Sequence, residues 1–244
     1  MAQLEVSRTG RVSVLTLTRP EQGNRLSQEM AEQLTSALEA ARRDPEIGAC
    51  VITGHGHVFC LGGDYKGAGP TIAGRAEFGR ASVDMYRAMA GLGKPLVAAV
   101  NGDAHAGGFS LVAAADLAVI ADDATLGLPE AVNGLFPFLA LAVVRDALPK
   151  KLLFDIIYNA RLIGAQEACD VHVVNKSVPR ARVLQEAIEM AMTASSYNSD
   201  IVMLGRDLYY NMRGAGPAEA VDKSRFALLA ALAAKDQEIK RTKS

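Results

Sequence analysis

The chain of 244 residues contains no tryptophan, few aromatic residues and only three cysteines. The cysteines, Cys50, Cys60 and Cys169, are odd in number and irregularly spaced, which argues against a disulfide framework and is typical of a reducing cytosol. The sequence also lacks an apolar run of about 20 residues, the length that a membrane-spanning helix needs. Its first residues have neither the basic nor the apolar segment of a secretory signal. These absences predict a cytoplasmic protein without membrane association.

An excess of charge of one sign is missing as well. The 26 Lys+Arg and 27 Asp+Glu residues give a formal net charge of −1. Nucleic-acid binding needs clustered basic residues, and the one basic run, at Lys240, Arg241 and Lys243, is more typical of a solvated tail than of a binding patch. We therefore expect no nucleic-acid partner.

His55 and His57 lack a third ligand nearby, so we expect no metal site either.

Half of the residues are hydrophobic, and their spacing predicts strands that alternate with helices. This alternation indicates an α/β core followed by a helical C-terminal part. We place the boundary so that residues 1–195 form the core and residues 196–244 the helical region. The predicted strands cover residues 12–17, 49–53, 96–100, 117–121, 125–128 and 173–178. The predicted helices cover residues 28–44, 71–89, 109–115, 140–147, 150–159, 182–195, 201–212 and 217–234.

Two glycine-rich loops follow predicted buried strands. In the first, residues 58–64, the consecutive Gly62 and Gly63 let the backbone approach a ligand closely and turn an N–H toward it. Taken alone, this loop is more simply explained as a strand-to-helix turn that needs glycine. In the second, residues 101–110, the loop leads into a helix, whose N-terminus offers unpaired N–H groups to an anion. Close packing of the helix on the strand explains these glycines equally well.

A carboxylate follows the two loops. Glu130 lies in an apolar setting, and an apolar environment raises the pKa of a carboxyl group and suits it to acid–base catalysis. By itself, the Pro129-Glu130 pair is more simply explained as a turn before a helix. Two loops that can each donate an N–H, together with one downstream carboxylate, are however the parts that enolate chemistry requires.

In their order along the chain and in their residues, these motifs resemble those of the crotonase superfamily, the enoyl-CoA hydratase and isomerase family. The resemblance covers about residues 10–195 and is specific for the family rather than for one reaction. The segments that carry it are the turn from Arg19 to Asn24, the first loop at residues 59–64, the second loop and its helix at residues 99–116, and the glutamate segment at residues 127–134.

The resemblance implies a spiral of ββα repeats, with a helical C-terminal region used for trimerisation into a homotrimer or a dimer of trimers. It also implies an enzyme of acyl-CoA metabolism. The thioester carbonyl would bind between the N–H groups of Gly63 and Gly107, with Gly108 as the alternative to Gly107. Glu130 would be the general acid/base. No cofactor is implied, because coenzyme A is part of the substrate. The further residues expected to bind substrate are Asn24, Arg25, Gly62, Asp64, His105, Gly108, Ser110 and Phe136.

The sequence departs from the family at Ser110, where hydratases that use two glutamates have the first of them. An unperturbed hydroxyl cannot act as a general base near neutral pH, and the single glutamate resembles that of the family's isomerases and hydratase-lyases. His105 fits either an extra acid/base or a hydrogen bond that holds the loop. The ring of Phe136 is expected to narrow the acyl pocket. Hydration, isomerisation, C–C cleavage, decarboxylation of a CoA or carrier-protein thioester, and a non-catalytic binding scaffold remain open.

Overall fold

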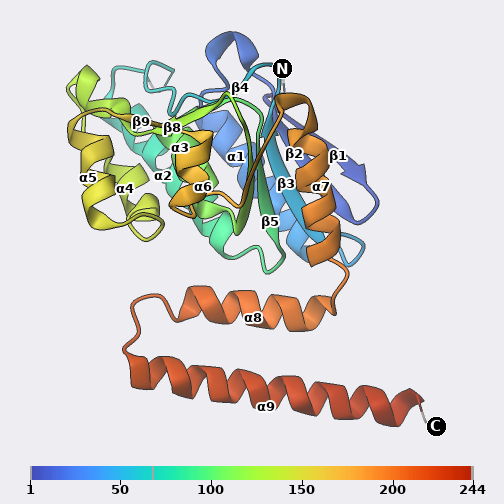
Figure 1. Ribbon diagram of the computed structural model, residues 1–244. Helices are drawn as coiled ribbons and strands as arrows, with labels where there is room; N and C mark the ends of the chain where they lie inside the picture. Colours follow the sequence, from blue (N-terminus) through green and yellow to red (C-terminus); the bar gives the residue numbers. More distant parts are fainter. Residues whose placement is uncertain (1, 68, 243–244) are drawn as a thin grey trace.

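The computed structural model describes residues 2–67 and 69–242 (Figure 1). Of the basic run near the C-terminus, Lys243 lies outside the described residues, and the side chains of Lys240 and Arg241 are outside them too. A six-stranded sheet forms the centre, in the order β1-β2-β3-β5-β7-β10. The hairpin β1–β2 is antiparallel and the other neighbours are parallel. The strands are β1 (Leu4–Thr9), β2 (Val12–Leu17), β3 (Ala49–Gly54), β5 (Leu96–Val100), β7 (Leu117–Ala121) and β10 (Lys176–Val178).

Helices cover the large sheet and bury its central strands. Every residue of β3 and β5 is buried, as expected for parallel strands covered on both faces. The helix α7 (Val183–Ala194) contacts β3, β5 and β7, whereas α1 (Gln28–Arg43) contacts β1 and β2. In Figure 1, α7 lies in front of this sheet and α1 behind it. The side chain of Ser27 caps α1 by accepting a hydrogen bond from the Met30 N–H at 3.1 Å, as its sequence predicts.

A second, smaller sheet positions the residues of interest. Its order is β4-β6-β8-β9, in which β4, β6 and β8 are parallel and β9 is antiparallel to β8. Three successive stretches of chain, which begin at β3, β5 and β7, each give one strand to the large sheet and one to the small sheet before a helix, which is the expected ββα repeat. The small-sheet strands are β4 (Val58–Cys60), β6 (Asp103–His105), β8 (Thr125–Gly127) and β9 (Leu162–Gly164). The helices that follow the first three are α2 (Ile72–Ala90), α3 (Gly107–Ala114) and, after the 3-10 turn η2 (Pro129–Asn133), α4 (Phe138–Val144).

The prediction that the glycine-rich segments at residues 58–64 and 101–110 are loops up to the helix that follows is wrong in part, because β4 and β6 lie inside them. A strand of three residues is too short to show the alternation of apolar and polar residues by which strands are recognised in a sequence. The edge strand β1, the strand β9 and the short helix α6 (Ala165–Asp170) were also not predicted. The remaining predicted elements are present, with ends shifted by a few residues.

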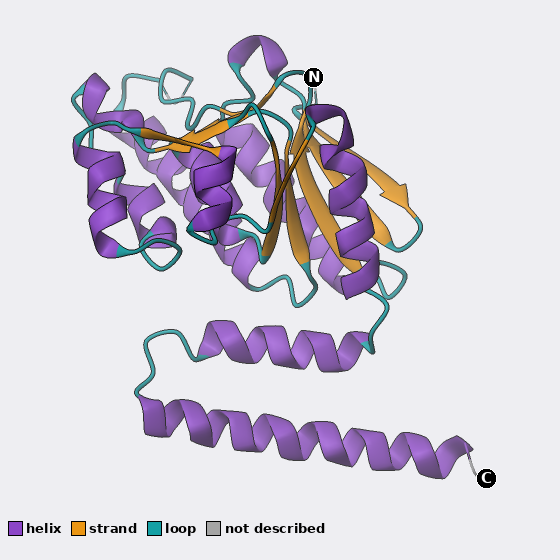
Figure 2. Ribbon diagram, viewed as in Figure 1, coloured by secondary structure: helices purple, strands orange, loops and turns teal. Residues whose placement is uncertain are grey.

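The chain ends in two helices that lie apart from the two sheets, α8 (Ser199–Asn211) and α9 (Pro217–Thr242). They run antiparallel to each other below the rest of the molecule (Figure 2). The predicted boundary at residue 195 falls in the connection between α7 and α8. Apolar side chains on α9 are exposed, namely Val221, Phe226, Leu228, Leu229 and Leu232. Within residues 2–67 and 69–242, no helix is both long enough and apolar enough to cross a membrane.

Candidate active site

The three parallel strands of the small sheet end side by side, and each leads into one part of the candidate site. The chain after β4 carries Gly63, the chain after β6 carries Gly107, and the chain after β8 carries Glu130. All three residues line one cavity of about 30 Å³. Such a volume holds a water molecule, and a longer acyl chain needs the lining side chains to move. The structure therefore brings the two glycines and the glutamate together.

The N–H of Gly63 is oriented by a bridge to the preceding turn. Leu26 donates its N–H to the carbonyl of Gly62 at 2.8 Å and accepts the N–H of Asp64 at 2.7 Å. In a parallel bridge of this kind, the N–H and C=O of the middle residue face away from the bridging strand. The N–H of Gly63 therefore faces away from Leu26 and is available to a ligand on the other side.

Gly62 must be glycine for two reasons. Its φ of +98° lies in a region that other residues rarely adopt, and a Cβ there would stand 2.7 Å from the Cβ of Ala106. The same close approach brings the first loop against the second. A Cβ on Gly107 would lie 3.5 Å from backbone atoms of Gly62. Gly62 thus shapes the site through its backbone and allows the two donor loops to touch.

Gly107 is the first residue of α3, so its N–H has no acceptor within the helix and lies at the positive end of the helix dipole. The residue before it, Ala106, has a φ of +53°, an uncommon value for alanine, and its N–H is held by the carbonyl of Gly127 at 2.8 Å. Gly108 is buried, does not line the cavity, and packs so closely that a Cβ there would lie 1.9 Å from the carbonyl oxygen of Cys60. Of the two predicted alternatives, Gly107 is the one at the cavity.

Glu130 brings a carboxyl group to the lining of the cavity. Its side chain stands in the turn η2 (Pro129–Asn133) and is 8% exposed. Its Oε2 atom is buried and has no hydrogen-bond partner among the residues that the structure describes. Burial penalises the charged form and raises the pKa of this carboxyl above its usual value. A carboxyl group with a raised pKa and an unoccupied oxygen is suited to taking up and releasing a proton.

Aromatic rings form much of the cavity wall. Tyr65 and Phe78 meet edge to face with centroids 5.2 Å apart, and both line the cavity. Phe136 packs against the core and is not among the lining residues, whereas Phe138 of the same segment lines the cavity. The two phenylalanine rings lie 5.5 Å apart, and a contact of Phe136 with substrate stays a prediction. The expectation of a narrow pocket agrees with the small volume.

Ser110 is not among the residues that line the cavity, and its contact with substrate stays a prediction. It is fully buried in α3, where its Oγ donates to the carbonyl of Gly107 at 2.9 Å and hydrogen-bonds the hydroxyl of Tyr86 at 2.5 Å. Tyr86, from α2, does line the cavity, and sequence reasoning missed it. A signal was present, because Phe78, Ser82 and Tyr86 follow one another at helical spacing and all three line the cavity.

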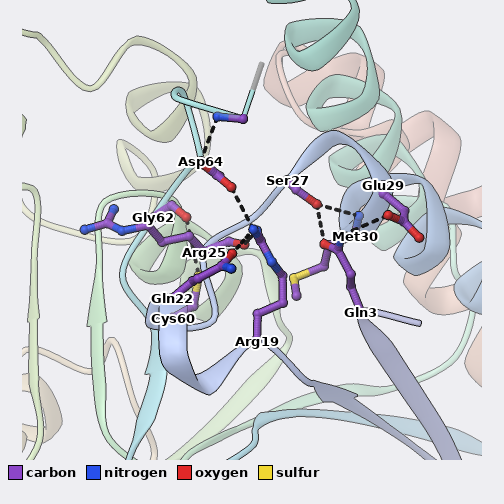
Figure 3. A network of polar contacts seen from close by, with 11 residues as sticks. Gln3, Arg19, Gln22, Arg25, Ser27, Glu29, Met30, Cys60, Gly62 and Asp64 are labelled. Carbon is purple, nitrogen blue, oxygen red and sulfur yellow. Dashed lines mark hydrogen bonds and ion pairs between the residues drawn. The ribbon is translucent and has the colours of Figure 1, made fainter. Parts of the chain in front are cut away.

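The turn before α1 and the first glycine loop form a polar network beside the site (Figure 3). The side chain of Asn24 is fully buried and holds three backbone groups, those of Arg19, His55 and Val58. Asn24 therefore shapes the turn through these bonds, and its contact with substrate stays a prediction. Arg25 is exposed and donates to the carbonyl of Leu61.

Arg19 and Asp64 join the two segments of this network by an ion pair of 2.8 Å, drawn in Figure 3. Burial alone would raise the pKa of Asp64, but hydrogen bonds from Arg19 and from the N–H of Gly67 outweigh it and lower that pKa. Asp64 is thus ionised and already paired. Arg19, Arg25 and Asp64 line an open groove of about 570 Å³ outside the cavity.

His105 lies away from the cavity. Its Nε2 shares a hydrogen bond of 2.8 Å with the hydroxyl of Thr125, and that hydroxyl donates to Asp103 at 2.8 Å. Because the single hydroxyl hydrogen of Thr125 goes to Asp103, the Nε2 of His105 carries the proton that Thr125 accepts. Burial, above all, lowers the pKa of His105. Two roles were predicted for His105, an extra acid/base and a hydrogen bond that holds the loop. The structure agrees with the second, and the hydrogen bond is made to the side chain of Thr125 rather than to the backbone.

No group of three His, Cys, Asp or Glu residues suited to a metal ion occurs in the part of the chain described.

Comparison with known proteins decides the family. A family model for enoyl-CoA hydratase/isomerase matches residues 7–226. The chain belongs to the enoyl-CoA hydratase/isomerase family. It is 35% identical over 234 residues to a putative enoyl-CoA hydratase of Thermus thermophilus, which is 94% of this chain and 90% of that protein. It is also 35% identical over 191 residues to carnitinyl-CoA dehydratase of Escherichia coli K12, 77% of this chain and 72% of the relative.

Solved structures of the enoyl-CoA hydratase/isomerase family share the fold. The crystal structure of an enoyl-CoA hydratase from Mycobacterium smegmatis superimposes with a TM-score of 0.90 at 26% identity, over 95% of this chain and 91% of that one. The crotonase-like α/β fold predicted from the sequence is therefore confirmed. The residues that the family model matches include the three strand ends that carry Gly63, Gly107 and Glu130.

Proposed function

We propose that this member of the family binds an acyl-CoA thioester and stabilises its enolate, with the N–H groups of Gly63 and Gly107 as the oxyanion hole and Glu130 as the general acid/base. One observation carries the proposal: the unpartnered, buried Oε2 of Glu130 belongs to the same small cavity as these two glycines. A buried carboxyl without a partner is costly to the fold. A catalytic role gives a reason for that cost.

The chemistry follows from the two kinds of group. When a proton leaves C2 of the thioester, negative charge develops on the carbonyl oxygen, and the two N–H groups stabilise it more in the transition state than in the ground state. Each such donor is typically worth roughly 10²–10³-fold in rate. Glu130 takes the C2 proton and returns a proton to the enolate, so one carboxylate suffices. The proposed chemistry needs no resident cofactor or metal, because coenzyme A arrives with the substrate.

Among reactions that share this enolate, addition and loss of water at C3 have the most support. The names of the two relatives, a putative enoyl-CoA hydratase and a carnitinyl-CoA dehydratase, both denote this chemistry. Isomerisation and retro-aldol cleavage by a hydratase-lyase use the same groups. Decarboxylation, including that of a carrier-protein thioester, needs no base for its first step, so the presence of Glu130 disfavours it. A non-catalytic scaffold gives no reason for a buried carboxyl without a partner.

The coenzyme is proposed to lie in the open groove beside Arg19 and Arg25. Both guanidinium groups suit the negative phosphates of coenzyme A, and Asp64, which lines the groove, directly follows Gly63, which lines the cavity. A trimer, or a dimer of trimers, formed through α8 and α9 is also proposed. It is supported by the exposed apolar side chains of α9, which a monomer would leave in water.

The test is exchange of the C2 protons of saturated acyl-CoA thioesters in heavy water, followed by mass spectrometry. Wild-type protein is expected to incorporate deuterium, and Glu130→Gln to lose at least about 10²-fold of that rate, since the amide cannot carry the proton. Tyr158→Phe, an exposed residue far along the chain on α5 (Lys150–Tyr158), serves as the control. Binding of the thioesters without exchange by wild-type protein would contradict the proposed chemistry, and absence of binding would contradict the coenzyme A assignment.

A further inference from the structure

Tyr86 adds a second polar group to the cavity that contains Glu130. Its side chain comes from the middle of α2 and lines the cavity together with Gly63, Gly107 and Glu130. Burial, and to a lesser degree the charge of Glu130, raise the pKa of Tyr86. The phenol therefore stays neutral at physiological pH, with one hydrogen to donate and lone pairs to accept.

The hydrogen-bond directions around Tyr86 follow from counting hydrogens. The Oγ of Ser110 donates its single hydrogen to the carbonyl of Gly107, which can only accept, at 2.9 Å. Because Ser110 donates to Gly107, the hydrogen of the 2.5 Å contact between Tyr86 and Ser110 is assigned to Tyr86. The chain of donation runs from Tyr86 through Ser110 to Gly107. The phenolic oxygen of Tyr86 is left as an acceptor.

We propose that the phenolic oxygen of Tyr86 and the carboxylate of Glu130 together bind the water that adds to C3 of a 2-enoyl thioester, or the hydroxyl group that leaves it. This inference rests on the proposed function and names the water-binding residue of the same site. One hydrogen of the water is accepted by Glu130 and the other by Tyr86. A water held by both hydrogens points its lone pairs away from these acceptors, toward the substrate carbon.

The addition of water to the 2-enoyl thioester needs only the water and the groups of the cavity. The water oxygen forms a bond to C3 as one of its hydrogens passes to the carboxylate of Glu130. The π electrons of the C2–C3 double bond move onto the thioester oxygen, held by the N–H groups of Gly63 and Gly107. The enolate then takes the proton from Glu130 at C2, which restores the carbonyl and the carboxylate. Tyr86 exchanges no proton and acts by orienting the water.

Ser110 has a defined part in this arrangement. Its hydroxyl holds the phenol of Tyr86, which lines the cavity. Without the Ser110 hydroxyl, the hydrogen of Tyr86 is free to turn toward the water, and donor and acceptor would be exchanged. Ser110 is thus a positioning residue for Tyr86.

The experiment compares two reactions of the same variants. Hydration of a short 2-enoyl-CoA is followed by loss of the conjugated thioester absorbance, and C2 proton exchange of a saturated acyl-CoA by mass spectrometry. Exchange needs Glu130 and the two N–H groups but no oriented water. Tyr86→Phe is expected to lower the hydration rate about 10²-fold, the loss typical of a misplaced reacting group, and to leave exchange within about twofold. Ser110→Ala is expected to lower hydration and not exchange, and Tyr158→Phe is the control.

The rates of hydration and of exchange separate the role of Tyr86 from the proposed function. Hydration by Tyr86→Phe at the wild-type rate, or an equal loss of hydration and exchange, would overturn the inference, the second because it marks a structural role. Exchange by wild-type protein without hydration of any enoyl thioester would also overturn it while leaving the proposed function in place. Absence of exchange in wild-type protein would remove the proposed function, and the inference with it.

Discussion

At the scale of single residues, the burial of Glu130 makes stability depend on pH. Its folded-state pKa is raised, so the folded protein binds this proton more tightly than the unfolded chain does. The stability from that proton is fully present below the unfolded pKa of about 4.3 and is lost as pH rises through the folded pKa. Glu130→Gln cannot ionise, so it is expected to unfold at a higher temperature than wild type at pH 8, with a smaller difference toward pH 4. Calorimetry between pH 4 and pH 8 measures the unfolding temperatures of the two proteins. A difference between these temperatures that stays constant with pH would contradict the prediction.

At the scale of elements, the docking of α3 on β4 places the N–H of Gly107 and depends on Gly108. A Cβ at Gly108 would stand 1.9 Å from the carbonyl oxygen of Cys60, so Gly108→Ala must push the helix from the strand. We expect a loss of about 1–3 kcal/mol in unfolding free energy, measured by urea denaturation. The matched control is Gly79→Ala in α2, where a Cβ meets nothing within 4 Å and alanine should stabilise the helix by up to about 1 kcal/mol. Equal effects of the two substitutions would show that the close contact is relieved without cost.

The elements also show what the sequence could and could not predict. Long helices and fully buried strands, such as α1 and β5, are specified locally by a cap or an unbroken apolar run, and their prediction is confirmed. The three-residue strands β4 and β6 are not specified locally, because each forms only by pairing with strands distant in sequence. Tyr86 has a local signal in its helical spacing with Phe78 and Ser82, but its contact with Ser110, 24 residues away, is not specified locally. The glycine loops and Glu130 could be singled out because each motif consists of adjacent residues, whereas the roles of Gly63, Gly107 and Glu130 come from the resemblance and stay predictions.

At the scale of the whole molecule, α8 and α9 extend from the sheets and leave a row of apolar side chains in solvent. If these helices form the proposed trimer, Leu229→Gln, at a residue 56% exposed, should weaken assembly by removing apolar contact area. Val6→Gln, on the edge strand β1 and 57% exposed, is the matched control. Sedimentation equilibrium is expected to give three or six times the 25.8 kDa chain mass for wild type and the control, and a smaller mass at low concentration for Leu229→Gln. A monomeric wild-type protein would contradict the assembly, whereas an unchanged mass for the variant would move the interface to another surface.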